Sequence, residues 1–125
     1  YDPLDHADPW KSYRPGGTAN DLASIDRAMG LWIRATEACA LNVTGTAPAS
    51  TAITLHAGWN LVGYPSGTPR SASDALTGTG ATVVSVYQGA APYIYDRTDL
   101  SAVTMEAGNG YWICVPADAL WTLEW

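Results

Sequence analysis

The chain has 125 residues, of which 47% are hydrophobic and 14% charged, and its formal net charge is −6. This length predicts a single domain spanning 1–125 with a core that needs no metal to hold it. The hydrophobic content excludes a disordered tail. The acidic balance argues against nucleic acid and against anionic membranes. No apolar run reaches the roughly 18 residues of a membrane span, so we expect no membrane insertion.

The first 50 residues carry only short structural patterns between turn-forming residues. Residues 1–20 are rich in Pro, Gly, Asp and Asn and predict a loop. Asn20 or Asp21 is a suitable helix N-cap for the residues that follow. The elements expected here are a short strand at 10–13, one or two helical turns at 21–29, and strands at 31–35 and 41–44.

Residues 51–65, TAITLHAGWNLVGYP, predict the central feature of the fold. Two apolar, β-favouring segments flank a small turn containing glycine, a pattern typical of a β-hairpin. The second segment, from Trp59 to Tyr64, is apolar at nearly every position. It therefore predicts a central strand that is buried on both faces.

Short elements continue to the end of the chain. A serine cap before SASDAL predicts a short helix near 71–76. The Ala-Gly-Asn-Gly run at 107–110 is a strong turn signal. Further strands are expected at 83–87, 92–95, 111–115 and 120–123. Many short strands at regular spacing predict an all-β sandwich or barrel-like fold with one short helix.

The sequence contains an internal similarity. Gly30-Leu31-Trp32-Ile33 and Gly110-Tyr111-Trp112-Ile113 share the pattern Gly-x-Trp-Ile. The neighbouring residues follow in the same order, so about 9–45 resembles about 92–125, on either side of the hairpin 51–65. We expect two related half-units, which either share this hairpin in one closed domain or pair end strands with a neighbouring copy.

Two motifs carry a family resemblance that covers most of residues 20–124. The stretch AGWNLVGYP at 57–65, the helix after it, and MEAGNGYWI at 105–113 together resemble a β-module of secreted and surface-attached proteins of bacteria and archaea. These modules occur in adhesin-like and S-layer-like polypeptides. The resemblance implies extracellular structural or adhesive use, and it supplies no catalytic residues.

The reactive side chains form no recognisable catalytic or metal-binding pattern. The two histidines stand alone, and no serine lies in a Gly-x-Ser-x-Gly context. Asp2, Asp5 and Asp8 recur every third residue, but the spacing lacks the glycine and distal glutamate of a calcium loop, so a solvated acidic loop is favoured. We expect no enzyme, no catalytic residue, no cofactor and no metal site.

Two covalent modifications are consistent with the sequence. Cys39 and Cys114 form one disulfide in an oxidising compartment, or they are two buried thiols. Asn42 begins an Asn-Val-Thr glycosylation sequon. A glycan there requires Asn42 to face solvent, with Leu41 and Val43 facing the core by strand alternation.

Aromatic side chains are the remaining candidates for a binding surface. The chain has six tryptophans and seven tyrosines, and it has no phenylalanine. Trp32, Trp59 and Trp112 lie inside apolar runs and are expected in the core. Four others lie near loops and suit a sugar-stacking platform or a subunit contact, although rim packing is the simpler interpretation. These four are Trp10, Tyr13, Tyr93 and Tyr95.

Two functional hypotheses follow. The first is a non-enzymatic extracellular structural module, a processed subunit or segment of a filament, stalk or S-layer-like assembly. Strand pairing and aromatic packing would join it to copies of itself or to flanking modules. The alternative is a carbohydrate-binding or adhesive module, in which loop aromatics stack on the sugars of a surface polysaccharide.

Overall fold

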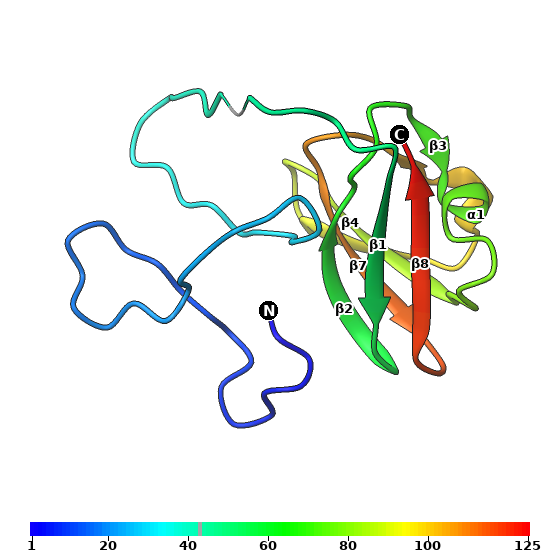
Figure 1. Cartoon of the computed structure of the whole chain (residues 1–125), viewed down its shortest axis with the longest axis horizontal. Coiled ribbons are helices and arrows are strands. Elements are labelled where there is room, and N and C mark those ends of the chain that lie inside the picture. The colour runs from blue at the N-terminus through cyan, green and yellow to red at the C-terminus, as the bar shows by residue number, and fades with distance from the viewer. Residues whose placement is uncertain (43) are drawn as a thin grey trace.

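The computed structural model describes residues 1–42 and 44–125, and all the strands lie in the C-terminal part of that range (Figure 1). Strands make up 31% of the structure and helices 6%, which confirms the predicted all-β fold with one short α-helix. Residues 1–42 and 44–49 form extended loops beside this body, with an isolated β-bridge at Met29.

A long two-stranded ribbon forms the frame of the body. β1 (Ser50–Leu55) leads into β2 (Gly58–Gly63), and β7 (Gly110–Val115) leads into β8 (Ala119–Glu124). β1 pairs antiparallel with β8, and β2 pairs antiparallel with β7, through six residue pairs in each half. The predicted β1–β2 hairpin is therefore wrong. Pairing with the C-terminal strands sets buried residues opposite buried residues, as with Ile53 and Trp121 or Val62 and Tyr111.

The ribbon bends sharply where β1 meets β2. Leu55 pairs with Ala119 and Gly58 pairs with Val115, so two residues on one side face the three residues 116–118 on the other. An extra residue on one strand is a β-bulge, which bends the strands and increases their twist. Gly58 adopts a φ of 98° at this corner, a conformation that side chains disfavour. The corner directs the two halves of the ribbon into different sheets.

The side chain of Asn60 holds the corner together. It is 3% exposed, and its Oδ1 accepts from the His56 N–H at 2.8 Å. Its Nδ2 donates to the His56 carbonyl at 2.8 Å and to the Gly58 carbonyl at 3.2 Å. This one amide therefore satisfies backbone groups that lose their strand partners at the bend.

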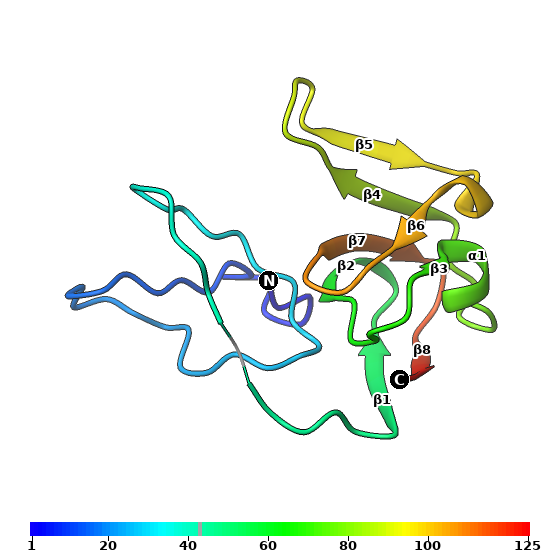
Figure 2. The same ribbon diagram turned by 90° about the horizontal axis from the view of Figure 1, so that it is seen from above.

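Three sheets result from this frame (Figure 2). The four-stranded sheet consists of β2, β7, β4 (Val83–Tyr87) and β5 (Ile94–Arg97) in that order, so β7 is a central strand and the prediction that β2 is central is wrong. β1 and β8 form a second sheet, and β3 (Arg70–Ser71) and β6 (Thr104–Met105) form a third. The remaining elements are α1 (Ala72–Ala75) and η1 (Leu100–Ala102).

The core lies between the sheets and beneath α1. Its fully buried side chains include Leu55, Val84, Met105 and Ile113. Trp121 is 1% exposed, and its Nε1 donates to the Ala75 carbonyl at 2.6 Å, which ties β8 to α1.

The three tryptophans predicted in the core lie elsewhere. Trp32 is 51% exposed, Trp59 is 39% exposed, and Trp112 is half-buried. Strand alternation explains the error for Trp59 and Trp112, whereas Trp32 lies on no strand. In β7, Tyr111 and Ile113 point inward, so Trp112 between them points out.

Several local predictions are confirmed. Ser71 is the N-cap of α1, where its Oγ accepts from the Asp74 N–H at 3.1 Å. β4 spans the predicted residues 83–87. Gly108 has a φ of 83° in the turn before β7. The strand predicted at 92–95 begins two residues later, at Ile94.

The predictions for the first 50 residues are mostly wrong. In the described residues, 10–13, 31–35, 41–42 and 44 form no strand, and 21–29 form no helix. Asp21 Oδ1 accepts from the Ser12 N–H at 2.6 Å, and Asn20 Oδ1 accepts from the Arg14 N–H at 2.8 Å. Both side chains close a loop and so do not cap a helix. The duplication stays a prediction from sequence, and Val43 lies outside the described residues.

The role of Asn60 gives a first prediction. Asn60→Ala removes the partners of the His56 N–H and C=O at the corner. We expect unfolding free energy to fall by about 1–3 kcal/mol, the usual cost of unpaired buried polar groups. Urea titration at pH 7 measures this, with Asn42→Ala at an exposed position as the control. A loss no larger than that of the control would contradict the role of Asn60.

A second prediction concerns Asp118 at the same corner. The Ala57 N–H donates to Asp118 Oδ1 at 2.8 Å, and His56 Nδ1 lies 3.6 Å from Oδ2. The hydrogen bond, helped by His56, lowers the pKa of Asp118 below its ordinary value of 3.8. A lowered folded-state pKa contributes stability above the unfolded pKa, and this contribution is lost as pH falls through the folded value.

We therefore expect Asp118→Asn, which keeps an oxygen acceptor, to lose less stability than the wild type between about pH 5 and pH 2. Thermal unfolding across this range measures the difference. Parallel stability curves for the two proteins would contradict the assignment.

Candidate functional site

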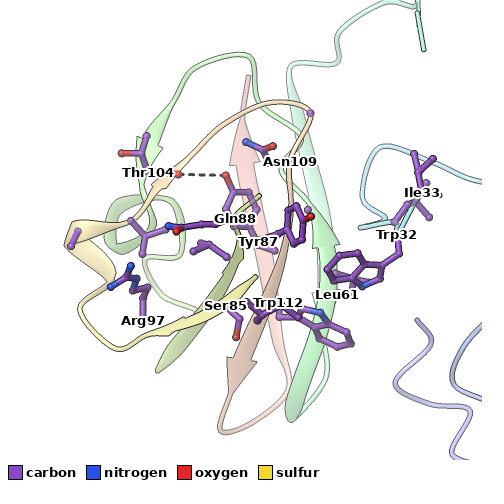
Figure 3. A pocket seen from close by; sticks show the side chains of 18 residues that line it. Trp32, Ile33, Leu61, Ser85, Tyr87, Gln88, Arg97, Thr104, Asn109 and Trp112 are labelled. Carbon is purple, nitrogen blue, oxygen red and sulfur yellow. Dashed lines mark hydrogen bonds between the residues drawn. The ribbon is translucent and has the colours of Figure 1, made fainter. Parts of the chain in front are cut away.

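The outer face of the four-stranded sheet carries a row of large side chains. Alternation along each strand places Trp59 and Leu61 of β2, Trp112 of β7 and Tyr87 of β4 on this face. Leu61 pairs with Trp112, which also pairs with Ser85 of β4, so Trp112 lies at the centre of the row. Figure 3 shows Leu61 and Trp112 side by side on the sheet.

Aromatic residues from the N-terminal loops pack against this row. The ring of Tyr1 lies 4.8 Å from that of Trp112, and the ring of Trp10 lies 5.8 Å from it. Trp59 completes the contacts of Trp112 at 6.5 Å, and Trp32 contacts Tyr87 at 5.4 Å. All these pairs are edge-to-face, with angles between 67° and 88°. We call the six residues the aromatic clasp: Tyr1, Trp10, Trp32, Trp59, Tyr87 and Trp112.

Beside the clasp, a short N-terminal stretch pairs with the free edge of β2. Met29 forms an antiparallel bridge with Val62. The Gly63 N–H donates to the Ala28 carbonyl at 2.8 Å. The stretch therefore adds to the sheet at the edge that β2 would otherwise leave unpaired.

Two glycines in the sheet make room for this stretch, and we call Gly63 and Gly110 the glycine seat. A Cβ on Gly63 would lie 2.8 Å from the Met29 carbonyl oxygen, and one on Gly110 would lie 3.3 Å from the Cα of Gly30. A Cβ on Gly30 itself would lie 2.8 Å from the Val62 carbonyl oxygen. None of the three glycines has a positive φ. Their small size, rather than their backbone freedom, is what the contact requires.

Trp32 lines two hollows on this face. One, of about 580 Å³, is lined by Tyr1, Trp10, Trp32, Trp59, Ser85, Ile94 and Trp112. The other, of about 660 Å³, lies between Trp32 and the turn before β7 (Figure 3). Ser85 lines both hollows and donates a hydrogen bond from its Oγ to the Asp96 carboxylate. Both hollows have the size of small-molecule sites, and this chain's own aromatic rings line them.

The residues predicted as a ligand or subunit platform lie in different places. Trp10 belongs to the clasp, whereas Tyr13 is 63% exposed on a loop. Tyr93 is 52% exposed with a φ of 68°, and Tyr95 packs its ring against the Arg97 guanidinium at 5.4 Å. No ring contact joins Trp10 to these tyrosines in the described part of the chain. Sequence analysis missed the other five clasp residues, because it placed Trp32, Trp59 and Trp112 in the core and gave no role to Tyr1 or Tyr87. Strand alternation is the signal that identifies Trp59, Tyr87 and Trp112.

The predicted modification sites are described in part. Cys39 is exposed and Cys114 is half-buried, and both are free thiols in the structure, so a disulfide between them stays a prediction. Asn42 is exposed, and its glycosylation also stays a prediction. Leu41 is 73% exposed, so the expectation that it faces the core is wrong.

The acidic N-terminal loop is organised by a lysine. Lys11 Nζ lies 2.6 Å from Asp5 Oδ2 and 3.7 Å from Asp8 Oδ2. Asp2 Oδ1 accepts from the Leu4 N–H at 2.9 Å. Over residues 1–42 and 44–125, no three His, Cys, Asp or Glu side chains gather in a way that could hold a metal ion.

Comparisons with known proteins give no assignment. Neither the protein-family models, nor the curated proteins, nor the solved structures contain a match to this chain. The family resemblance of the two motifs therefore stays a prediction from sequence. In the described part of the chain, no helix combines the length and the apolar character needed to cross a bilayer.

The clasp gives a third prediction. Edge-to-face aromatic pairs contribute about 0.5–1.5 kcal/mol beyond burial. A double-mutant cycle with Trp10→Ala and Trp112→Ala should therefore give a coupling energy in that range in urea unfolding. The control cycle combines Trp10→Ala with Tyr93→Ala. Tyr93 is 52% exposed, as Trp10 is, and it lies outside the clasp. Equal coupling in both cycles would contradict the clasp.

Proposed function

We propose that this protein is a non-enzymatic extracellular structural module that joins to copies of itself or to flanking modules. The observation that carries the proposal is the outer sheet face, which binds a polypeptide segment by strand pairing and aromatic packing together. Ala28 and Met29 pair with the edge of β2, while Trp10 and Trp32 pack on the sheet beside it.

The glycine seat supports a polypeptide as the ligand of this face. Backbone approaches Gly63 closely enough that any side chain there would clash with the Met29 carbonyl. Strand addition obtains affinity from main-chain hydrogen bonds and specificity from pockets for alternate side chains. The Gly63–Ala28 hydrogen bond is a main-chain contact of this kind. The packing of Trp32 on Tyr87 is a side-chain contact of the same segment.

Free strand edges offer further places for association. β1 and β8 form a two-stranded sheet, and β5 ends the four-stranded one. Unpaired edges are templates for pairing with another chain unless charge protects them. β5 carries Asp96 and Arg97, whereas β8 exposes Leu120 at 65%. The β8 edge is therefore the better candidate for contact with a neighbouring module.

Composition supports an extracellular location. Only 14% of the residues are charged, so polar contact with water depends on Thr, Ser, Asn and turn backbone. Asn42 and Thr44 of the sequon are exposed, as glycosylation requires.

The second candidate function is carbohydrate binding, which the 580 Å³ hollow and its tryptophans favour. Sugar rings stack on open aromatic faces. In the clasp, Tyr1 and Trp10 already pack edge-to-face with Trp112, with interplanar angles of 67° and 69°. This arrangement fills the face with the protein's own side chains, so we rank sugar binding below polypeptide binding.

Sedimentation equilibrium of the full chain, from about 1 μM to 2 mM, tests the proposal. We expect the mean mass to rise above the 13.2 kDa of one chain. Leu120→Lys should weaken association about tenfold, because it places charge on the β8 edge. Leu41→Lys is the matched control, since Leu41 is 73% exposed, lies on no strand and is outside the N-terminal residues that pack on the sheet.

A single-chain mass at every concentration would contradict self-association. Binding to a glycan array that is lost in Trp59→Ala would then favour the carbohydrate-binding candidate.

A further inference from the structure

We propose that residues 1–33 of one copy bind the aromatic sheet face and glycine seat of a second copy, so that neighbouring copies exchange their N-terminal segments. The inference rests on the proposed function, and it names the partner of the outer face as the same chain. The occupant is already visible, because this face holds the chain's own N-terminal segment.

The connection between this segment and the body permits exchange. From 34 to 47, every described residue is exposed. Residues 34–49 would span about 50 Å when extended, at roughly 3.3–3.6 Å per residue. The body, residues 50–125, has a radius of gyration of about 11 Å by the usual scaling with chain length. The linker is therefore long enough to carry the segment from its own sheet to the sheet of a neighbour.

The contacts are the same in either arrangement. Gly30 meets Leu61 and Val62, and Gly63 donates to Ala28, whichever copy supplies the segment. Exchange therefore differs from self-binding only in the entropy of association. Covalent attachment through a short linker gives an effective concentration on the order of millimolar, so self-binding dominates in dilute solution. Exchange dominates where copies are crowded in an assembly or where self-binding is blocked.

Two glycine substitutions block self-binding from opposite sides. In Gly30→Val the added Cβ would lie 2.8 Å from the Val62 carbonyl oxygen, which disables the segment and leaves the seat intact. In Gly63→Val it would lie 2.8 Å from the Met29 carbonyl oxygen, which disables the seat and leaves the segment intact. Neither glycine has a positive φ, so valine fits the backbone at both positions.

The experiment mixes the two full-length variants and measures mass by light scattering after size exclusion. At about 20 μM each, we expect either variant alone to have the mass of one 13.2 kDa chain, and the equimolar mixture to contain a 1:1 heterodimer. Gly45→Val is the control, because a Cβ there meets nothing within 4 Å. Mixed with either variant, it should give no more heterodimer than wild type does.

A mixture that stays at the mass of one chain would overturn the exchange. Concentration-dependent association of the wild type would then still support the structural module through its strand edges. Circular dichroism establishes that each variant is folded before mixing. Should Gly63→Val unfold, Gly63→Ala replaces it, because its single Cβ already meets the Met29 carbonyl oxygen.

Discussion

The antiparallel pairing of β1–β2 with β7–β8 is the constraint on which the rest of the structure depends. It joins segments about 60 residues apart and sets which side chains face inward along four strands. The bulge opposite His56 and Ala57 bends this ribbon, and Asn60 satisfies the backbone at the bend. The inner side of the bent ribbon becomes the core, and its outer side becomes the aromatic face.

The AGWNLVGYP motif is explained by this geometry rather than by chemistry. Gly58 provides a positive φ at the corner, and Asn60 holds it. Trp59 faces outward to the clasp, whereas Gly63 admits the backbone of the N-terminal segment. Tyr64 is buried and its hydroxyl donates to the Thr68 carbonyl at 2.7 Å. Gly58 and Asn60 therefore serve the bend, Trp59 and Gly63 serve the surface where another stretch of chain binds, and Tyr64 serves the core.

Sequence patterns predicted the local elements of this fold and missed its long-range pairing. The serine cap of α1 and the turn at Gly108 depend on neighbouring residues, so they could be read directly. The partner of β2 is about 50 residues away, and a turn containing glycine is equally typical of a hairpin and of a corner. Trp112 was misplaced because a tryptophan in an apolar run suits either face of a strand until its neighbours are oriented.

The central claim is that a segment of polypeptide completes the sheet at Gly63, and amide hydrogen exchange at that residue tests it most directly. The Gly63 N–H donates to Ala28 rather than to β7, so its protection reports the docked segment alone. The account predicts that this amide is protected in the wild type and loses protection in Gly30→Val, while the amide of Ile113 in β7 stays protected in both. A Gly63 amide that exchanges in the wild type at the rate of an open chain would contradict the account.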